Sequence, residues 1–267
     1  MDRALAMTDR IIEQCHAQGI YFLIGWVAGV AAYPRLMLNR PQDAAPYLAM
    51  VRPQYDSLAP FQRGYLHFLT AWQAYLVEDF QLALRECEQA DTLNSGVQCP
   101  LGEAEIRVGW AMTCHALGND DEAHRLLASL EAQVQISSNY TLGRCLWLLA
   151  KARLHLDAGQ ESEGLTALRE GLELAAETGQ HYLPWGRPDE TAKILVRALD
   201  EQIEPAFVRL LIANLQIKPV GVARYSTAWP WAIKVCTLGK FEICVHDQPL
   251  QFGRKTPRKT LALLQAI

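Results

Sequence analysis

A repeat of about 40 residues runs through most of this 267-residue chain and constrains its fold more than any other feature. Five alanines mark the repeat, at spacings of 40, 40, 41 and 40 residues: Ala31, Ala71, Ala111, Ala152 and Ala192. Seven residues after each alanine we expect a turn, at Leu38-Asn39, Glu78-Asp79, Gly118-Asn119, Gly159-Gln160 and Leu199-Asp200. Self-similarity at a fixed period of this length predicts a stack of equivalent supersecondary units.

A second pattern follows the turn in three of the copies. It consists of a small residue, a larger apolar residue or cysteine four positions on, and a small or apolar residue three positions further. The three copies are Ala83, Cys87 and Ala90; Ala123, Leu127 and Leu130; and Gly164, Leu168 and Gly171. Spacings of four and three place all three positions on one face of a helix. Small residues there allow two helices joined by a short turn to pack about 8–10 Å apart.

Each unit is therefore predicted to contain a helix A, a tight turn, a helix B and a longer loop. We expect the A helices at 20–38, 61–78, 103–118, 140–158 and 188–199. We expect the B helices at 42–52, 80–93, 121–135, 161–178 and 204–216. Residues 2–18 have the pattern of a B helix from a preceding unit.

The pattern resembles the tetratricopeptide repeat, and Ala111, Gly118, Ala123 and Leu127 fit its spacing best. Three features depart from that family: a period near 40 rather than 34, Leu38 and Glu78 in place of the turn glycine, and Ala44 one position late in the first B helix. The chain is most similar to the longer repeats in the sensor domains of large bacterial transcriptional activators of the maltose-regulon type. The resemblance implies a mainly α protein, with about five hairpins in a right-handed superhelical stack over residues 1–217.

Charge and composition change near residue 218. Residues 218–267 contain eight Lys or Arg and two acids, a net charge of +6, which leaves −10 for residues 1–217 in a chain of net charge −4. Residues 218–231 contain two prolines and one glycine and lose helical periodicity, which is typical of a linker. A change of sign between two parts of a chain indicates two domains with different partners.

The period becomes two after residue 231, as expected for β-structure. Ile233 and Val235 alternate with polar neighbours, and the alternation resumes at Ile243 and Val245. This predicts a β-hairpin that turns at Gly239. We expect a third short strand at Leu250 and Phe252, and a helix that begins at Thr256-Pro257 and carries Leu261 and Leu264 on one face.

Residues 232–267 resemble the start of a winged-helix DNA-binding domain of the response-regulator and antibiotic-regulator type. The matching positions are Leu238, Gly239, Phe241, Ile243, Pro249 and Leu250, followed by a basic group of Arg254, Lys255, Arg258 and Lys259. The resemblance implies that this basic group contacts the nucleic-acid backbone. The recognition helix and wing of that family would follow residue 267, so we expect sequence-specific DNA binding only from a complete winged-helix domain.

In stacked hairpins the A helices line the concave face. Polar and aromatic A-helix residues at helical spacing are therefore candidates for a ligand- or partner-binding groove: Arg63, His67, Arg107, Trp110, Arg144, Trp147 and Lys151. Cations beside aromatic rings would suit an acidic or peptide-like ligand. The alternative is structural, with the tryptophans in the core between repeats and the arginines on a solvated edge.

The sequence thus predicts a regulatory helical-repeat domain of a bacterial transcriptional regulator, which binds a protein, a peptide or a small-molecule effector and passes that state to a DNA-binding domain. A general protein–protein interaction scaffold, unconnected to transcription, is the alternative. A nucleophile–base set is not visible, so we expect no enzyme activity, and no motif indicates a cofactor.

The cysteine pattern indicates a reducing compartment and no metal site. Seven cysteines are present, without a Cys-x-x-Cys pair, which favours a cytoplasmic protein without disulfides. Cys15-His16 and Cys114-His115 are adjacent pairs that point to different helix faces. The most apolar stretch, Ile20–Tyr33, has 14 residues, whereas a membrane-spanning helix needs about 20. We therefore expect no contact with a membrane.

Overall fold

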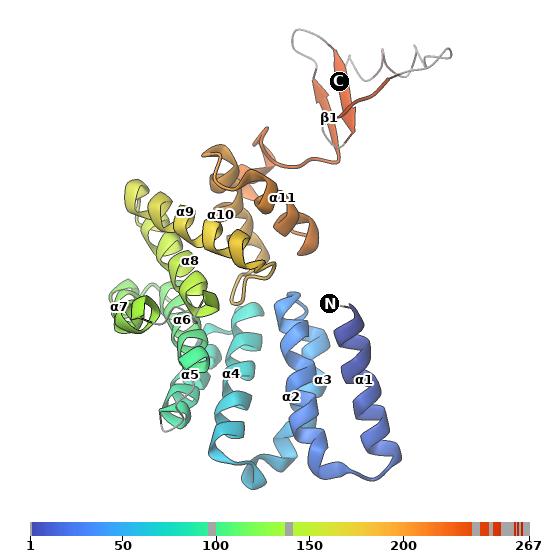
Figure 1. Ribbon diagram of the computed structural model, residues 1–267, viewed down its shortest axis with the longest axis vertical. Coiled ribbons are helices and arrows are strands. Elements are labelled where there is room, and N and C mark those ends of the chain that lie inside the picture. Colours follow the sequence, from blue (N-terminus) through green and yellow to red (C-terminus); the bar gives the residue numbers. More distant parts are fainter. Residues whose placement is uncertain are drawn as a thin grey trace.

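The computed structural model of the protein describes residues 2–95, 100–136, 141–236, 241–245, 248–251, 259, 261 and 263. Within these ranges the chain forms eleven α-helices, two short 3-10 helices and a three-stranded antiparallel sheet near the C-terminus (Figure 1). The predicted fold class, a mainly α stack of helical hairpins with a small C-terminal β segment, is confirmed. The right hand of the superhelix stays a prediction.

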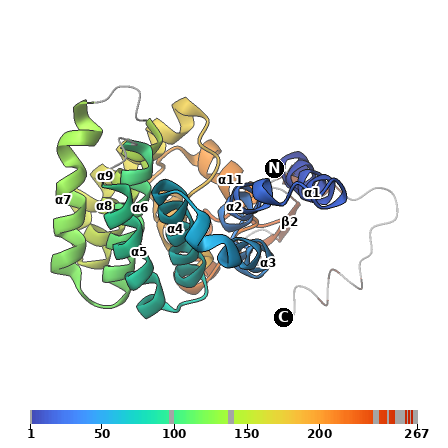
Figure 2. The same cartoon turned by 90° about the horizontal axis from the view of Figure 1, so that it is seen from below.

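Helix α1 (Asp2–Ala17) precedes five helical hairpins. They are α2 (Tyr21–Met37) with α3 (Pro41–Val51), α4 (Pro60–Leu76) with α5 (Phe80–Asn94), α6 (Pro100–Ala116) with α7 (Asp120–Ile136), α8 (Thr141–Asp157) with α9 (Glu161–Thr178), and α10 (Pro188–Asp200) with α11 (Pro205–Asn214). The 3-10 helix η1 (Arg52–Ser57) links the first two hairpins. Figure 2 shows the hairpins side by side, from α1–α3 at one end to α7–α9 at the other. All helices predicted within residues 1–217 exist.

The repeated small residues lie where the two helices of a hairpin meet. All five marker alanines of the A helices have no exposed surface, and the same holds for Ala44, Ala83 and Ala123 of the B helices. In the fourth hairpin, Gly164 takes the equivalent position, and a Cβ there would lie 2.7 Å from the Leu156 side chain. The repeat in the sequence is therefore the trace of close contact between helices.

The turns between A and B helices share one geometry. Asn39, Glu78, Gly118 and Gly159 all have positive φ, between 55° and 77°. After each of them, an N–H bonds to the carbonyl five residues earlier, as in the 2.9 Å bond from Arg40 to Arg35. This is the Schellman motif, which satisfies the last carbonyls of a helix.

The predicted turn Leu38-Asn39 is confirmed, although Asn39 and not Leu38 takes the place of the turn glycine. The predicted turn Leu199-Asp200 is wrong. In the first hairpin the left-handed residue is Asn39 rather than Leu38, since a short polar side chain tolerates positive φ better. In the fifth hairpin the turn is at Gln202, because α10 continues through Asp200. The helix that follows begins at Pro205, a residue suited to a first helical position, and this shifts the turn towards it.

The buried side chains form two core clusters. The first cluster joins α1 to α8 and includes one distant residue, Trp185 from the loop between α9 and α10. The second joins α8 to α11 and extends to Ala223 and Trp229, which lie within the predicted linker. The 3-10 helix η2 (Gly221–Arg224) thus packs on α10. Residues 218–231 have the composition of a linker, but part of this segment is docked on the last hairpin.

The C-terminal strands are β1 (Ile233–Cys236), β2 (Glu242–Val245) and β3 (Gln248–Pro249), in that spatial order. Val235 pairs with Ile243 and Ile233 with Val245, as the predicted hairpin requires. The third strand precedes its expected position at Leu250, whose N–H still bonds to the carbonyl of Ile243 at 2.7 Å. The expected turn at Gly239 and most of the final helix lie outside the described residues; Lys259, Leu261 and Leu263 are helical.

Candidate partner-binding surface

The A helices curve around a common side, which we call the inner face. The Tyr33 hydroxyl on α2 donates a 2.8 Å hydrogen bond to the Glu105 carboxylate on α6. Helix α4 lies between them in the stack and contacts both α2 and α6. A direct bond from the first A helix to the third requires the stack to curve towards the side where they meet. The inner face is therefore the concave side, where partner recognition was expected.

Aromatic side chains form a continuous row along this face. On α4 they recur at spacings of four, three, four and three: Phe61, Tyr65, Phe68, Trp72 and Tyr75. This spacing places all five on one stripe of the helix. From α2, the Trp26 ring centroid lies 5.9 Å from that of Tyr65, and the Tyr33 centroid lies 5.4 Å from that of Trp72.

The two ends of the aromatic row differ in exposure. At the end near the start of α2 and α4, Trp26 is 40% exposed, Phe61 39% and Val30 40%. At the other end, Trp72 and Tyr75 are almost completely buried. We call the first part the open end and the second part the closed end. Soluble proteins bury most large aromatic side chains, so the open end is the part available to a partner.

The closed end is covered by residues 180–187, the loop between α9 and α10, which we call the strap. Trp185 is 2% exposed, and its ring stacks on Trp72 with a centroid distance of 5.7 Å. It also meets Phe68 and Tyr75 at 5.9 and 5.6 Å. Below it lies Gly109 of α6, where a Cβ would come within 2.1 Å of the indole. Only glycine leaves room for Trp185 at this position.

Two further contacts hold the strap to the first two hairpins. The side-chain amide of Asn39, at the first turn, donates a 2.8 Å hydrogen bond to the carbonyl of Gly186. Arg187 lies 3.2 Å from the Glu78 carboxylate at the second turn and stacks over the Phe80 ring. The turns that mark the repeat therefore also receive the strap.

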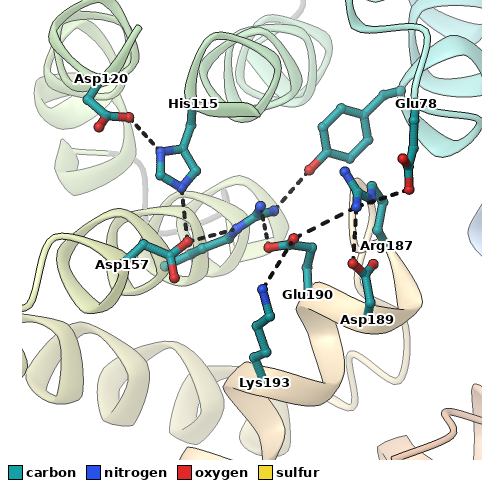
Figure 3. A network of polar contacts seen from close by, with 10 residues as sticks. Glu78, His115, Asp120, Asp157, Arg187, Asp189, Glu190 and Lys193 are labelled. Atoms are coloured by element: carbon teal, nitrogen blue, oxygen red, sulfur yellow. Dashed lines mark hydrogen bonds and ion pairs between the residues drawn. The ribbon is translucent and has the colours of Figure 1, made fainter. Parts of the chain in front are cut away.

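A network of charged groups extends from the strap across four hairpins (Figure 3). Arg187 also pairs with Asp189 and Glu190 at the start of α10. Glu190 pairs with Arg153 of α8, which donates a 2.9 Å hydrogen bond to the Tyr75 hydroxyl. The network places the start of α10 against α4 and α8.

His115 forms a second branch of this network. Its Nδ1 lies 2.6 Å from Asp120 of α7, and its Nε2 lies 2.9 Å from Asp157 of α8. Asp157 in turn lies 3.6 Å from Arg153. The hydrogen bond that the His115 ring donates to Asp157 is the main cause that raises the pKa of His115, and the same bond lowers the pKa of Asp157. The His115 side chain therefore links three helices.

Glu105 is the most perturbed carboxyl group of the inner face. Burial raises its pKa to about 7, against a smaller lowering effect from the hydrogen bond that Tyr33 donates. Burial also raises the pKa of Tyr33 and Tyr65, so both phenols stay protonated at neutral pH. The inner face thus contains one carboxyl group that titrates near neutral pH inside aromatic surroundings.

A small cavity lies behind the strap. It has a volume of about 60 Å³, and apolar side chains of α6, α8, α9 and α10 form most of its wall, including Met112, Leu149 and Ile194. Leu183 and Trp185 close it on the strap side. The strap therefore covers the inner face without filling the space beneath it, and packing at this seam is less complete than in an ordinary core.

A larger hollow of about 650 Å³ lies between α1 and α3. The buried Arg35 is part of its wall and donates hydrogen bonds of 2.7 Å to Asp9 and 2.8 Å to the Tyr47 hydroxyl. The guanidinium also stacks on the Tyr47 ring at 4.0 Å. Because its charge is already paired, Arg35 ties α1 and α3 to α2.

The structure places Arg63 and His67 together, at the seam between α4, α5 and η1. Arg63 donates to the backbone carbonyls of Asp56 and Leu58, at 2.6 and 3.0 Å. His67 lies between the Glu86 carboxylate and the Tyr55 hydroxyl, at 2.6 and 2.8 Å. Both side chains hold the η1 loop against the second hairpin. This pair therefore has a structural role in the fold.

Arg107 and Trp110 lie on neighbouring turns of α6. Arg107 bridges Asp91 of α5 at 3.0 Å and Glu103 at 2.8 Å. Trp110 is half-buried and packs against the first core cluster. Neither side chain belongs to the aromatic row of the inner face.

Trp147 and Lys151 share a groove of about 210 Å³ between α7 and α8, which His124 and His155 also line. Trp147 is buried and donates a 2.8 Å hydrogen bond to the Leu127 carbonyl, while the Lys151 ammonium lies 4.4 Å from its ring centroid. Arg144 is exposed. Six of the seven groove candidates therefore lie at three separate seams between helices rather than in a single groove, and Arg144 is exposed on α8.

The principal residues of the inner face were not among those candidates. The stripe from Phe61 to Tyr75 has a clear helical spacing, which a search for aromatic periodicity would have found. Trp185 offers no such signal, because it lies in a loop more than 100 residues along the sequence from Trp72 and the other α4 rings that it contacts. Its role depends on the way the chain turns back after α9.

Of the basic group expected to contact nucleic acid, only Lys259 lies within the described residues, where it is exposed and helical. Arg254, Lys255 and Arg258 lie outside them. The sheet before this group exposes apolar side chains, among them Ile233, which is 63% exposed.

The cysteines that the structure describes in the helical stack are buried. Cys87, Cys114 and Cys145 have little exposed surface, and burial raises the pKa of Cys114 to about 11 and that of Cys145 to about 12. Such thiols stay protonated and fill space between helices. In the described ranges, no group of three or more His, Cys, Asp or Glu side chains is arranged to hold a metal ion. In the same ranges, no helix combines the length and apolarity of a membrane span.

Comparisons with known proteins give no match: no family model, no curated protein and no solved structure is similar to this chain. The function must therefore be argued from the geometry described above.

Proposed function

We propose that this chain is the regulatory helical-repeat part of a bacterial transcriptional regulator, and that its inner face binds a protein or peptide partner. The observation that carries the binding role is the open end of the aromatic row. Trp26, Val30 and Phe61 remain exposed there, next to buried rings of the same row. Large rigid aromatic side chains that are left uncovered are typical of recognition surfaces.

The dimensions favour a peptide over a small effector. Pockets for small molecules usually have volumes of about 300–1,000 Å³ and surround most of the ligand. The cavity under the strap has about 60 Å³, and the open hollow between α1 and α3 has its one buried charged residue, Arg35, already paired. An elongated aromatic row on a concave face fits an extended segment better.

The link to transcription depends on the C-terminal segment. Its hairpin, with Val235 opposite Ile243, is followed by a region rich in Lys and Arg. This order is similar to the start of a winged-helix domain. The exposed apolar side chains of the hairpin, such as Ile233, are consistent with a sheet that packs against further helices in a complete domain.

The product of the whole reading frame provides the test. Purified protein would be mixed with random double-stranded DNA, and bound sequences would be enriched and read. We expect a defined sequence motif, and we expect Trp26→Ala with Phe61→Ala to alter transcription from a reporter carrying that motif while DNA affinity stays unchanged. The matched control is Leu210→Ala, an exposed apolar residue on α11. Failure to enrich any motif would reject the proposal.

A scaffold without a role in transcription is the second candidate, and the aromatic row supports it equally. It predicts that the same Trp26→Ala and Phe61→Ala variant loses its protein partner in a two-hybrid assay, while the full-length protein enriches no DNA motif. The two candidates thus share the binding surface and differ in the output.

A further inference from the structure

We propose that the strap is a tethered ligand: the indole pocket at the closed end of the inner face is a recognition site for an extended peptide with a tryptophan followed by Gly-Arg, and Trp185 occupies that site in cis. The inference deepens the proposed function by naming the chemistry of the partner. It rests on that function only in treating the inner face as a binding surface.

Trp185 is held in a conformation that an ordinary core residue would avoid. Its φ is +62°, a left-handed value that is unusual for a bulky aromatic residue. Its indole N–H is buried and has no hydrogen-bond partner in the described structure. Both features cost free energy, and they persist only where surrounding contacts compensate for them. The strap is therefore docked with its main anchor under strain.

Besides Trp185, few contacts attach the strap to the first two hairpins, and apart from the Arg187 stack over Phe80 they are polar. Gly186 receives one hydrogen bond from Asn39. Arg187 pairs with Glu78 and Asp189, whose side chains are 64% and 43% exposed. Ion pairs with exposed carboxylates contribute little to stability, because water and salt screen them. The cavity of about 60 Å³ behind Leu183 and Trp185 further weakens the seam. Trp185 is thus the main apolar anchor between the strap and the first two hairpins.

The pocket itself is built to receive an indole. Trp72 stacks on one side of the ring, Phe68 and Tyr75 present their edges, and Gly109 opens the floor. Glu78 and the Phe80 ring lie where the following arginine binds. The same aromatic row continues without interruption to the open end at Phe61 and Trp26. A partner peptide can therefore contact the open end first and then compete with Trp185 for the closed end.

Release of the strap would reach the last hairpin directly. The strap ends at Pro188, the first residue of α10, and Glu190 of that helix pairs with Arg153. Helices α10 and α11 also pack on α8 and α9 through the second core cluster, and η2 leads from α10 to the sheet. A partner that replaces Trp185 thus removes one attachment of the hairpin that adjoins the C-terminal segment.

The test uses a fluorescein-labelled peptide with the sequence of residues 180–190, QHYLPWGRPDE, as the probe, and fluorescence polarisation as the measurement. Wild-type protein is expected to bind it weakly, because the tethered copy is present at high effective concentration. Trp185→Ala empties the pocket, so we expect its affinity for the peptide to exceed that of wild type by about tenfold or more. A peptide with alanine in place of the tryptophan should lose this gain.

Arg187→Ala is the second variant, because it loosens the strap without emptying the core. It should bind the peptide better than wild type and less well than Trp185→Ala. The matched control is Arg209→Ala, at an exposed position on α11, which should behave as wild type. Circular dichroism would verify that each variant is folded.

Three results would overturn the inference. The first is a folded Trp185→Ala or Arg187→Ala protein whose affinity for the peptide equals that of wild type. The second is equal binding of the peptide that lacks tryptophan. The third is a strap exchanged between two copies of this chain, which light scattering would detect as a wild-type dimer that Trp185→Ala dissociates. None of these measurements involves DNA, so failure here is distinct from failure of the proposed link to transcription.

Discussion

The open and closed ends of the inner face are built from the same kind of residue and differ in what covers them. Both contain aromatic rings that α2 and α4 contribute to the same row along the inner face. At the closed end Trp185 covers Trp72, whereas at the open end Trp26 and Phe61 face solvent. The difference shows that a repeat fold can present one continuous surface and let a distant loop decide which part of it is available.

The largest contrast should appear when one tryptophan is removed from each end. Trp72→Ala should lower the free energy of unfolding by about 3–5 kcal/mol, because a large buried ring leaves a cavity. Trp185→Ala should cost less, about 2–3 kcal/mol, because a loop relaxes around the space left by the ring more readily than the packed helix α4 does. Trp26→Ala should change stability by less than about 1 kcal/mol. Urea unfolding followed by circular dichroism gives all three values; equal losses for Trp72 and Trp26 would erase the distinction between the ends.

Gly109 allows the closed end to be broken without removing a ring. A Cβ at this position would lie 2.1 Å from the Trp185 ring. Gly109→Ala should therefore displace the strap and lower the free energy of unfolding by about 1–3 kcal/mol, the usual range for overpacking. In the Trp185→Ala background the same change should cost much less, because the clash is gone. Gly102→Ala, in the first turn of the same helix, is the control, and additive losses in the double variant would contradict the contact.

Glu105 adds a dependence on pH to the inner face. Its pKa is raised to about 7 in the folded protein. The contribution of the neutral carboxyl group to the free energy of unfolding is therefore fully present below its ordinary pKa and is lost as the pH rises through 7. Glu105→Gln keeps an acceptor for the Tyr33 hydroxyl and cannot ionise. It should raise the free energy of unfolding by about 1–3 kcal/mol at pH 8 and leave it nearly unchanged at pH 5. Thermal melting at both values tests this, and a gain that is independent of pH would rule out ionisation as its cause.

The helical stack could be predicted from the sequence because local signals agree with the tertiary structure. The alanines that set the period are the fully buried contact positions, from Ala31 to Ala192. The predicted ends of the helices differ from the observed ones by at most three residues. The turns of four hairpins lie at the predicted residues. The turn of the fifth hairpin lies later than predicted, because Pro205 sets the start of α11.

The candidate site was less predictable, because its geometry depends on contacts between distant segments. Arginines beside aromatic residues suggested a groove, yet Arg63 and Arg107 bind backbone or carboxylate groups of adjacent helices. Spacing alone cannot tell an A-helix residue on the inner face from one at the seam with helix B. The strap was not foreseen, since the return of Trp185 to Trp72 leaves no trace in local composition.

The smallest effect is expected at the edge of the network that supports the closed end. His115 has a raised pKa, so the stability that it contributes is present below its ordinary pKa and lost as the pH rises through the folded value. Its partners Asp120 and Asp157 are 59% and 41% exposed, so the contribution should stay below about 1 kcal/mol. His115→Asn should lower the melting temperature at pH 5.5 more than at pH 8, opposite in direction to the gain from Glu105→Gln. His16→Asn on α1 is the control.

Because the network reaches the strap through Arg153 and Glu190, His115→Asn should also raise peptide affinity slightly at low pH. An unchanged affinity would show that the network does not influence the closed end.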